Sequence, residues 1–375
     1  MEDIRNEMLA ENLLKHSIQL KKQEKILIEV IGTEGIPLAK ELVKLATNMG
    51  ALPIFNIIDE TVLRALLEQA TKEQIENYAK YDLIKMKQMD AYIGIRSGKQ
   101  EAFQGVNNQK MEMYQTLYTL PVHFEERVKH TRWCVLRYPN EEMAKMNQCS
   151  LEELKTYYFQ VCNMDYEKMK VAMEPLQEFM NQTDKVHILG ENTDLTFSIK
   201  GIHAEKYFGT FNIPDGEVAT APVKESVNGY ITYNTKSTYQ GITFENIYLE
   251  FKDGKIIKAT AGDKTEELNH ILNVDEGARY IGEFAIGVNP YIEKAVGDTL
   301  FDEKIKGSFH FTPGNCLEES NNKNQSAIHW DLVCIQNPEY GGGEIWFDDI
   351  LIRKDGRFVV EKLWPLNPEN LVNNQ

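Results

Sequence analysis

The N-terminal part of the chain alternates short apolar runs with amphipathic stretches. Residues 25–32 (KILIEVIG) and 51–59 (ALPIFNIID) are apolar runs of strand length, and the stretch between them has helical spacing and ends at Gly50. A strand, a helix and a strand in this order predict a parallel βαβ unit with a right-handed crossover. The same patterns predict further helices over residues 1–23, 60–70, 73–88 and 140–182 and strands over 91–98 and 131–139. We therefore expect an α/β N-terminal domain with parallel βαβ units over residues 1–182.

The pattern changes near residue 183. From there on, short strand-like runs follow one another at close intervals and are separated by turn residues. The sequence KDG occurs at 252–254 and again at 354–356, each time between two strand-like runs, which predicts two hairpins. Only residues 262–280 and 288–298 have a helical pattern. These features predict a β-rich α+β C-terminal domain over residues 183–375.

Two segments of this second domain contain histidine. In SFHFT, the two phenylalanines alternate with polar residues, so a strand would point His310 to the face opposite the phenylalanines. In AIHWDLVC, a strand would point His329 and Asp331 to the same face, where an imidazole and a carboxylate can bind one metal ion. The polar loop between the two segments is expected at the surface. The alternative is that both histidines are solvated strand residues.

Three acidic residues have informative surroundings. Glu217 follows the turn sequence PDG and begins a strand-like run, although a hairpin with an exposed acid has the same pattern. Glu283 lies among small and apolar residues in RYIGEFAIG, where a lone carboxylate is costly unless it is paired or bound to a metal. Glu303 lies in TLFDEKIKG, just before the His310 segment, and the alternative for it is a solvated acid in a charged turn.

This donor set suits a divalent metal centre. Carboxylates and imidazoles without a thiolate favour zinc, cobalt, manganese or magnesium. Six ligands exceed the usual three of a catalytic zinc and fit two ions about 3.5–4 Å apart, bridged by a carboxylate and a water. Such a centre activates water and polarises a carbonyl, which is hydrolase chemistry. All six candidates follow residue 183, so we expect residues 183–375 to form the metal-binding catalytic domain; they are Glu217, Glu283, Glu303, His310, His329 and Asp331.

Composition narrows the possible partners. The 375 residues have a formal net charge of −16, which argues against nucleic acid and anionic membranes as partners. The sequence has no apolar run of about 18 residues and no secretory signal pattern. The five cysteines form no C-x-x-C pair, as expected for reduced thiols in a cytoplasmic protein.

His123 and His130 do not form an H-E-x-x-H motif and are expected on a solvated helix face. The turn GTEGIP lacks the glycine pattern and the lysine of nucleotide-binding loops.

At the level of whole segments, the chain resembles the thermophilic metallo-aminopeptidases typified by aminopeptidase T and aminopeptidase S. The segments that carry the resemblance are RWCVLRYP, VHILGENTDLTFSIKGI, NIPDGEVATAPVKESVNGYITYNT, GARYIGEFAIGVN, TLFDEKIKGSFH and SAIHWDLV. The resemblance implies that the six candidates are the metal ligands and that Glu283 is also the general base. It further implies two divalent ions per subunit, a homodimer, and release of N-terminal residues from peptides with a free N-terminus.

Two departures from that family keep other readings open. The family often has a tyrosine seven residues after the first metal histidine, where this chain has Leu317, and the segment from Glu303 to His310 is longer by about two residues. A metal-binding oligomeric protein with weak or lost peptidase activity is therefore one alternative. A two-metal hydrolase of other amides or esters is another.

Overall fold

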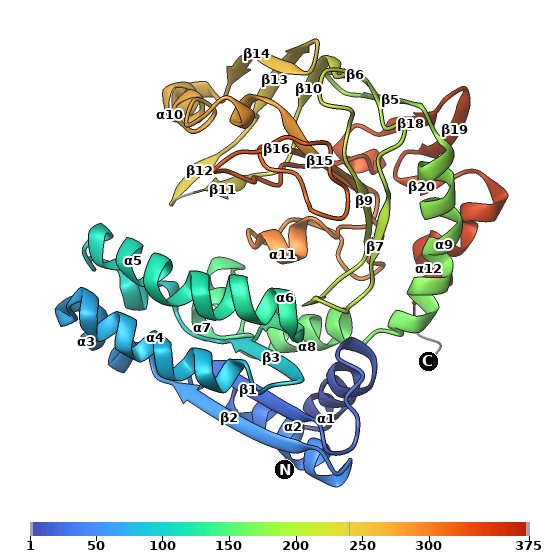
Figure 1. The fold of residues 1–375 in the computed structure, drawn as a ribbon. Helices are drawn as coiled ribbons and strands as arrows, with labels where there is room; N and C mark the ends of the chain where they lie inside the picture. The colour runs from blue at the N-terminus through green and yellow to red at the C-terminus, as the bar shows by residue number, and fades with distance from the viewer. Residues whose placement is uncertain (1–2, 240, 373–375) are drawn as a thin grey trace. The chain divides into compact units, whose positions relative to one another are not determined.

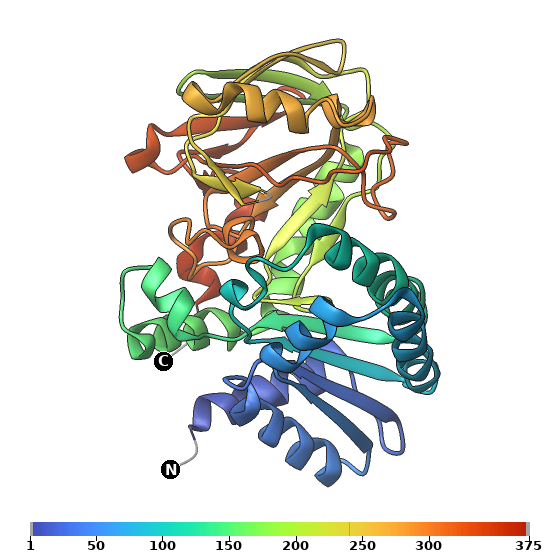
Figure 2. The same ribbon diagram turned by 90° about the vertical axis from the view of Figure 1, so that its left-hand side faces the viewer.

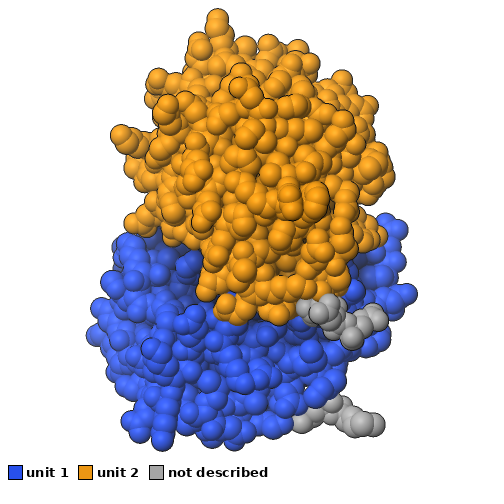
Figure 3. All heavy atoms as spheres, turned by 90° about the vertical axis from the view of Figure 1, so that its right-hand side faces the viewer, with its two compact units in different colours: residues 1–163, 209–213 blue, residues 164–208, 214–375 orange. Residues whose placement is uncertain are grey.

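The computed structural model describes residues 3–239 and 241–372 and divides the chain into two compact units (Figure 3). Unit 1 comprises Met1–Asn163 with Gly209–Ile213, and unit 2 comprises Met164–Phe208 with Pro214–Gln375. Unit 2 thus begins before helix α9 (Tyr166–Gln182), because α9 packs against strands β7 and β9 of that unit. A domain boundary near residue 183 stays a prediction.

Unit 1 is built on a five-stranded sheet with the strand order β2-β1-β3-β4-β8, in which every pair is parallel. The predicted βαβ unit is confirmed, because α2 (Ile36–Asn48) connects the parallel strands β1 and β2. Figures 1 and 2 show helices on both faces of the sheet. The strands are β1 (Lys25–Ile31), β2 (Leu52–Ile58), β3 (Ala91–Arg96), β4 (Arg132–Arg137) and β8 (Asn212–Ile213).

The helices of unit 1 begin where the sequence offers capping side chains. Thr71 and Ser150 each form a capping box at the start of a helix, which satisfies backbone N–H groups that would otherwise lack a partner. Between β3 and residue 112 the chain forms the 3-10 helix η2 and the beginning of α5. The elements are α1 (Ile4–Asn12), η1 (Leu13–Ser17), α3 (Glu60–Gln69), α4 (Lys72–Met86), η2 (Gln100–Phe103), α5 (Asn108–Tyr114), η3 (Gln115–Arg127), α6 (Val128–His130), α7 (Glu141–Met146) and α8 (Leu151–Cys162).

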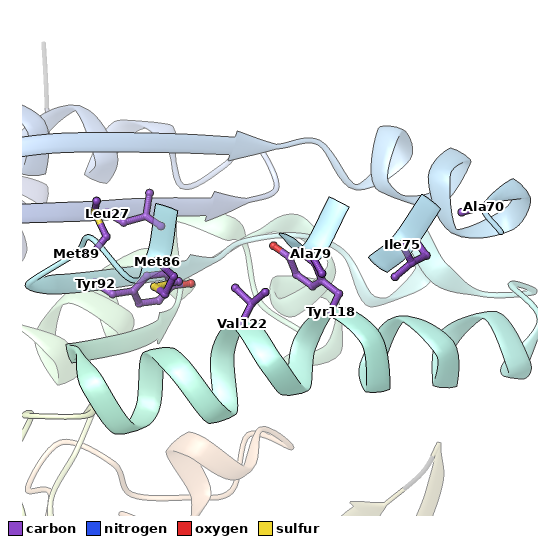
Figure 4. Close-up of a cluster of buried hydrophobic side chains, with 9 residues drawn as sticks. All are labelled: Leu27, Ala70, Ile75, Ala79, Met86, Met89, Tyr92, Tyr118 and Val122. Atoms are coloured by element: carbon purple, nitrogen blue, oxygen red, sulfur yellow. The ribbon is translucent and has the colours of Figure 1, made fainter. Parts of the chain in front are cut away.

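A cluster of buried apolar side chains joins the sheet of unit 1 to α4 and to the π-helix η3 (Figure 4). Leu27 and Tyr92 pair across β1 and β3 and contribute from the sheet, while Val122 contributes from η3. His123 follows Val122 and is only 8% exposed, so its expected place on a solvated face is wrong, whereas His130 is exposed. Burial lowers the pKa of His123 to about 4 and keeps the imidazole neutral at pH 7.

Unit 2 contains an eight-stranded antiparallel sheet with the order β14-β13-β10-β6-β5-β18-β19-β20. Both KDG sequences form the predicted hairpins, one between β13 and β14 and one between β19 and β20. At each turn the aspartate and the glycine have positive φ, as a two-residue hairpin loop requires. The strands are β5 (Lys185–Gly190), β6 (Thr193–Ser198), β10 (Asn228–Thr232), β13 (Tyr248–Lys252), β14 (Lys255–Thr260), β18 (Gly343–Phe347), β19 (Ile350–Lys354) and β20 (Arg357–Phe358).

A second antiparallel sheet of unit 2 has the order β17-β16-β15-β9-β7 and packs on the first through aromatic residues (Figure 1). The ring of Phe311 lies 5.0 Å from that of Phe197 on β6 and 5.9 Å from that of Phe251 on β13, and Phe284 lies 5.1 Å from Phe197. All four rings are buried. The strands are β7 (Glu205–Tyr207), β9 (Glu217–Thr220), β15 (Ile281–Gly287), β16 (Ser308–Pro313) and β17 (Val333–Ile335).

Two helical predictions in unit 2 need correction. Residues 288–298 are described throughout and contain no helix, because the side chain of Asn289 turns inward, donates to the carbonyl of Asp215 at 2.8 Å and is followed by Pro290. Residues 262–280 contain only short helical pieces. The remaining elements of unit 2 are β11 (Ser237–Tyr239), β12 (Ile242–Phe244), η4 (Gly262–Lys264), α10 (Thr265–Ile271), η5 (Gly277–Arg279), α11 (Thr299–Asp302), η6 (Pro338–Tyr340), η7 (Glu361–Leu366) and α12 (Pro368–Leu371).

Among the residues that the structure describes, no helix combines the length and the apolar character that a membrane crossing needs.

We predict that Phe311→Ala lowers the free energy of unfolding of unit 2 by about 3–5 kcal/mol, because it removes a fully buried ring from between the two sheets. Urea unfolding in excess chelator measures this without a contribution from metal binding. Ile257→Ala, at a side chain that is 54% exposed in the same unit, is the control and should change stability by about 0.5 kcal/mol or less. A loss below about 1 kcal/mol for Phe311→Ala would contradict the assigned core.

Candidate metal centre

Three of the candidate residues lie on one face of the five-stranded sheet of unit 2. Glu217 is the first residue of β9, Glu283 lies on β15 and His310 lies on β16, which are neighbouring strands. Glu217 pairs with Gly287 and His310 pairs with Ala285, two positions from Glu283 and on the same face. The small residues at 285 and 287 leave the space above the sheet to the three functional side chains. The opposite face carries the phenylalanines of the core.

His329 and Asp331 reach the same site from an irregular extended segment. The predicted strand over 327–334 is confirmed only for Val333 and Cys334, which belong to β17, and His329 forms an isolated bridge with Gly314. The predicted alternation still holds, because Ile328, Trp330 and Leu332 are buried while the histidine and the aspartate are partly exposed. Backbone bonds from Trp330 to Pro313 (3.1 Å) and from Phe311 to Leu332 (3.1 Å) hold the segment beside β16.

The five side chains form two groups of possible metal ligands that share Glu283. One group is Glu217, Glu283 and His310, and the other is Glu283, His329 and Asp331; within each, the ligand atoms lie within 4.8 Å of one another. Oε1 of Glu283 lies 3.4 Å from Nε2 of His310, and Oε2 lies 3.2 Å from Nε2 of His329. Nε2 of His329 is also 3.2 Å from Oδ1 of Asp331. The two oxygens of the Glu283 carboxylate therefore face two different histidines, Oε1 facing His310 and Oε2 facing His329.

Two atoms of the first group are buried without a hydrogen-bond partner among the described residues. They are Oε2 of Glu217 and Nδ1 of His310, and they lie 3.6 Å apart. A buried acceptor without a partner costs free energy, about 1–3 kcal/mol and more when it is charged. A cation between the carboxylate oxygen and the imidazole nitrogen would satisfy both, so the residues present fit a divalent metal ion.

Neighbouring groups orient the ligands of the second group. Nδ1 of His329 lies 2.8 Å from the carbonyl of Asn315, to which it donates, so Nε2 is the ring nitrogen that faces the carboxylates and would bind a metal ion. The hydroxyl of Thr312 donates to Oδ1 of Asp331 at 2.8 Å. His329 is 32% exposed, whereas the side chains of Glu217, Glu283 and His310 are nearly fully buried. The site is therefore open to solvent on the side of His329.

The electrostatics of the centre favour bound positive charge. Burial raises the pKa of Glu217 to about 8 despite the nearby ammonium of Lys304. Burial also opposes ionisation of Glu283, but hydrogen bonds from His310 and His329 lower its pKa to about 2. In return, burial opposes a charge on the two imidazoles, while the facing carboxylates raise the pKa of His310 to about 10 and that of His329 to about 12. In this arrangement the imidazolium protons occupy the role that a metal cation would take.

Glu303, the sixth candidate, lies beside the two groups and not within them. It follows α11 directly, its side chain is 14% exposed, and it forms an ion pair with Lys304 at 2.8 Å. Burial raises the pKa of Glu303, and the negative charge of Asp331 adds to this effect, so its carboxylate lies within electrostatic range of the second group.

Sequence reasoning missed Lys304. Its ammonium is buried, donates to Oε1 of Glu217 and lies 3.4 Å from Oδ1 of Asp215. Its local sequence, DEKIK, is charged and gave no signal of burial, because a lysine in such a stretch is normally solvated. Tyr207 was also missed; it pairs with Glu217 across β7 and β9.

The loop between the two histidine segments is more ordered than the expected surface connection. Asn322 and Asn324 are buried, at 6% and 0% exposure, which corrects that expectation. The amide of Asn322 donates to the carbonyls of Pro222 and Ile281, and that of Asn324 donates to those of Gly277 and Gly314. Because Gly314 also bridges to His329, this asparagine network supports one of the candidate ligands. Leu317 lies in the same loop and is partly buried.

Comparisons with known proteins extend over most of the chain. The model of the thermophilic metalloprotease (M29) family matches residues 3–358. Aminopeptidase PepS of Streptococcus thermophilus is 26% identical over 381 residues, which cover 88% of this chain and 92% of the relative. Aminopeptidase T of Thermus aquaticus is 27% identical over 277 residues, which cover 61% of this chain and 66% of the relative.

Two solved structures share the fold. Wild-type AmpT from Thermus thermophilus superposes with a TM-score of 0.78 at 21% identity, over 95% of this chain and 99% of that chain. The 2,5-dihydroxypyridine dioxygenase from Pseudomonas putida KT2440 superposes with a TM-score of 0.61 at 12% identity, over 96% of this chain and 98% of that chain. At these identities the likeness establishes the fold, and a function has to be argued from the site.

We predict that His329→Ala and Asp331→Ala each weaken metal binding at least about tenfold and leave the first group able to bind, because each removes a ligand of the second group only. Titration with zinc or cobalt ions against a chromophoric chelator measures this. His187→Ala is the matched control, since His187 pairs with Asp194 at 2.8 Å in the same unit and belongs to neither ligand group. Unchanged metal affinity in both variants would mean that the H-x-D pair is structural.

Proposed function

The chain belongs to the thermophilic metalloprotease (M29) family, and from this premise we propose that it is an aminopeptidase whose centre holds two divalent metal ions. The observation that carries the proposal is that Glu283 is shared between two ligand groups, with one oxygen toward each. A carboxylate in this position suits a bridging ligand of a two-ion site. The named aminopeptidases among the relatives support peptides as the substrate class.

The proposed ligands follow from the two groups. Glu217 and His310 bind the first ion, His329 and Asp331 bind the second, and Glu283 bridges them. Glu303 is proposed as the sixth ligand because of its electrostatic coupling to Asp331. The set has carboxylate and imidazole donors and no thiolate, so zinc, cobalt, manganese or magnesium fits it.

Ions bound at these residues would polarise the scissile carbonyl and make an attacking water more acidic. Glu283 is the proposed general base. Its carboxylate lies at the centre of the site, takes a proton from the attacking water and returns it to the nitrogen of the departing amine. The carboxylates around it would also accept hydrogen bonds from the α-ammonium group of a peptide, even where bound cations balance their charge. This favours peptides with a free N-terminus.

A metal-binding protein with weak peptidase activity is the second candidate function, and the leucine at position 317, in place of the tyrosine frequent in the resembling family, favours it. Hydrolysis of other amides or esters is the third. Both are separate outcomes of the substrate test below.

We expect the metal-loaded protein to cleave aminoacyl-p-nitroanilides and to leave their N-acetylated forms intact. Glu283→Gln should lower kcat at least about a hundredfold, because an amide keeps the volume and one oxygen ligand but cannot carry the proton. Glu344→Gln, at a surface acid bonded to Lys354 and Trp346, is the control. Near-normal turnover in metal-loaded Glu283→Gln would mean that the base is another residue. Cleavage of the acetylated substrate would favour the third candidate, and metal uptake without any turnover would favour the second.

We also propose a cytoplasmic homodimer. The resemblance to the aminopeptidase family supports the dimer, and the five cysteines, which form no disulfide in the described part of the chain, suit a reducing compartment.

Sedimentation equilibrium at micromolar concentration should give about twice the chain mass of 43.2 kDa, because the resemblance implies two copies per particle. The measurement should be repeated in excess chelator to separate dimerisation from metal uptake. A species of single-chain mass under both conditions would rule the dimer out at that concentration.

A further inference from the structure

Lys304 is a buried cationic side chain at the centre that neither the ligand set nor the proposed reaction uses. Its side chain is 3% exposed, and its ammonium contacts three carboxylates. It donates to Oε1 of Glu217 and lies 2.8 Å from Oε1 of Glu303 and 3.4 Å from Oδ1 of Asp215. A buried ammonium persists only where such partners compensate its lost hydration, so its position is strongly determined.

The contact with Lys304 gives the two carboxylate oxygens of Glu217 different surroundings. Oε1 accepts the bond from Lys304. Oε2 is buried 3.6 Å from Nδ1 of His310 and has no hydrogen-bond partner in the part of the chain that the structure describes. Glu217 can therefore offer only one oxygen to an ion on the side of His310. The lysine thus determines how this residue would bind, although it is not itself a ligand.

The backbone holds Lys304 in place independently of these side chains. Its N–H donates to the carbonyl of Phe301 at 3.1 Å at the end of α11, and its carbonyl accepts from the N–H of Asn289 at 3.0 Å. The position of the Lys304 backbone is therefore fixed by these hydrogen bonds, and the side chain extends from it toward Glu217.

The charges of the centre balance when Lys304 is counted. The proposed ligands include four carboxylates, and Asp215 beside Lys304 makes five negative charges. Two divalent ions contribute four positive charges, and the ammonium of Lys304 contributes the fifth, with both imidazoles neutral. A buried site of this kind is stable only near neutrality, because uncompensated charge in a low-dielectric interior is strongly unfavourable.

We propose that Lys304 is a positioning residue of the metal centre, which fixes Glu217 as a ligand through one oxygen and supplies the positive charge that two divalent ions leave missing. The inference rests on the proposed two-ion function. It assigns a role to the DEKIKG segment between α11 and β16.

The test is a metal titration of Lys304→Met, with cobalt or zinc ions as the probe and a chromophoric chelator as the competitor. We expect the ion on the His310 side to bind about 10–100-fold more weakly, because outer partners of ligands have effects of this size. The ion on the His329 side should lose less affinity, because the lysine reaches that group only indirectly, through its ion pair with Glu303 at 2.8 Å. The visible spectrum of bound cobalt gives a second readout, which a purely structural role of the lysine would leave unchanged.

Lys306→Met is the matched control, because Lys306 lies in the same segment but pairs with Glu293 at the surface, at 2.6 Å. It should bind both ions as the wild-type protein does. If Lys304→Met does not fold, the double variant Lys304→Met with Asp215→Asn removes one charge of each sign and keeps the proposal testable. Under the positioning role it still binds the first ion at least about tenfold more weakly.

The outcomes separate the two proposals. Wild-type affinities for both ions in Lys304→Met, or in the double variant, would overturn the positioning role and leave the two-ion function standing. Uptake of fewer than two ions by the wild-type protein would overturn the two-ion function and, with it, the charge balance assigned to Lys304.

Discussion

The centre of this molecule depends on one electrostatic constraint, which is that several carboxylates are buried together and need positive charge within contact distance. Glu217 and Glu283 lie on adjacent strands and are almost fully buried. Without compensation, charges in such surroundings are costly enough to protonate the group or to open the structure. Two histidines and one lysine meet this need in the described residues, and divalent ions would meet it more completely.

The five-stranded sheet of unit 2 has an aromatic face that packs in the core and an opposite face that carries the candidate ligands. Because side chains alternate along a strand, β15 and β16 point Phe284, Phe309 and Phe311 into the core and point Glu283 and His310 to the other side. The aromatic face fixes the strands against the eight-stranded sheet, and the register then fixes the distances among the polar groups. The candidate ligands on these strands are therefore held rigidly because the phenylalanines next to them in sequence are packed in the core.

The local pattern of apolar, polar and turn residues was sufficient to predict those features that depend on side-chain alternation and on turn residues. It predicted the parallel βαβ unit, the two KDG hairpins, the strand around His310 and the burial of Glu283, because each depends on a few neighbouring residues. It failed at residues 288–298, where the side chain of Asn289 bonds to the distant carbonyl of Asp215 and replaces a helix. It also missed Lys304, since the carboxylate that explains this lysine, Glu217, is remote in sequence. Such long-range partners leave no periodicity for a sequence pattern to reveal.

Three of the candidate ligands lie in rigid surroundings and His329 lies in less rigid ones, and this difference affects the chemistry expected at the site. Glu217, Glu283 and His310 belong to the central strands of a sheet and have no freedom to rearrange, whereas His329 is 32% exposed on an irregular segment. That segment depends on single bonds to Asn315 and on the asparagine network below it, which is enough to orient the imidazole without burying it. Under the proposed function, a substrate arriving from solvent would meet the His329 side first, while the carboxylate of Glu283 stays fixed behind it. Preorganised groups of this kind stabilise developing charge without a reorganisation cost, so the buried half of the site is the part from which rate enhancement is expected.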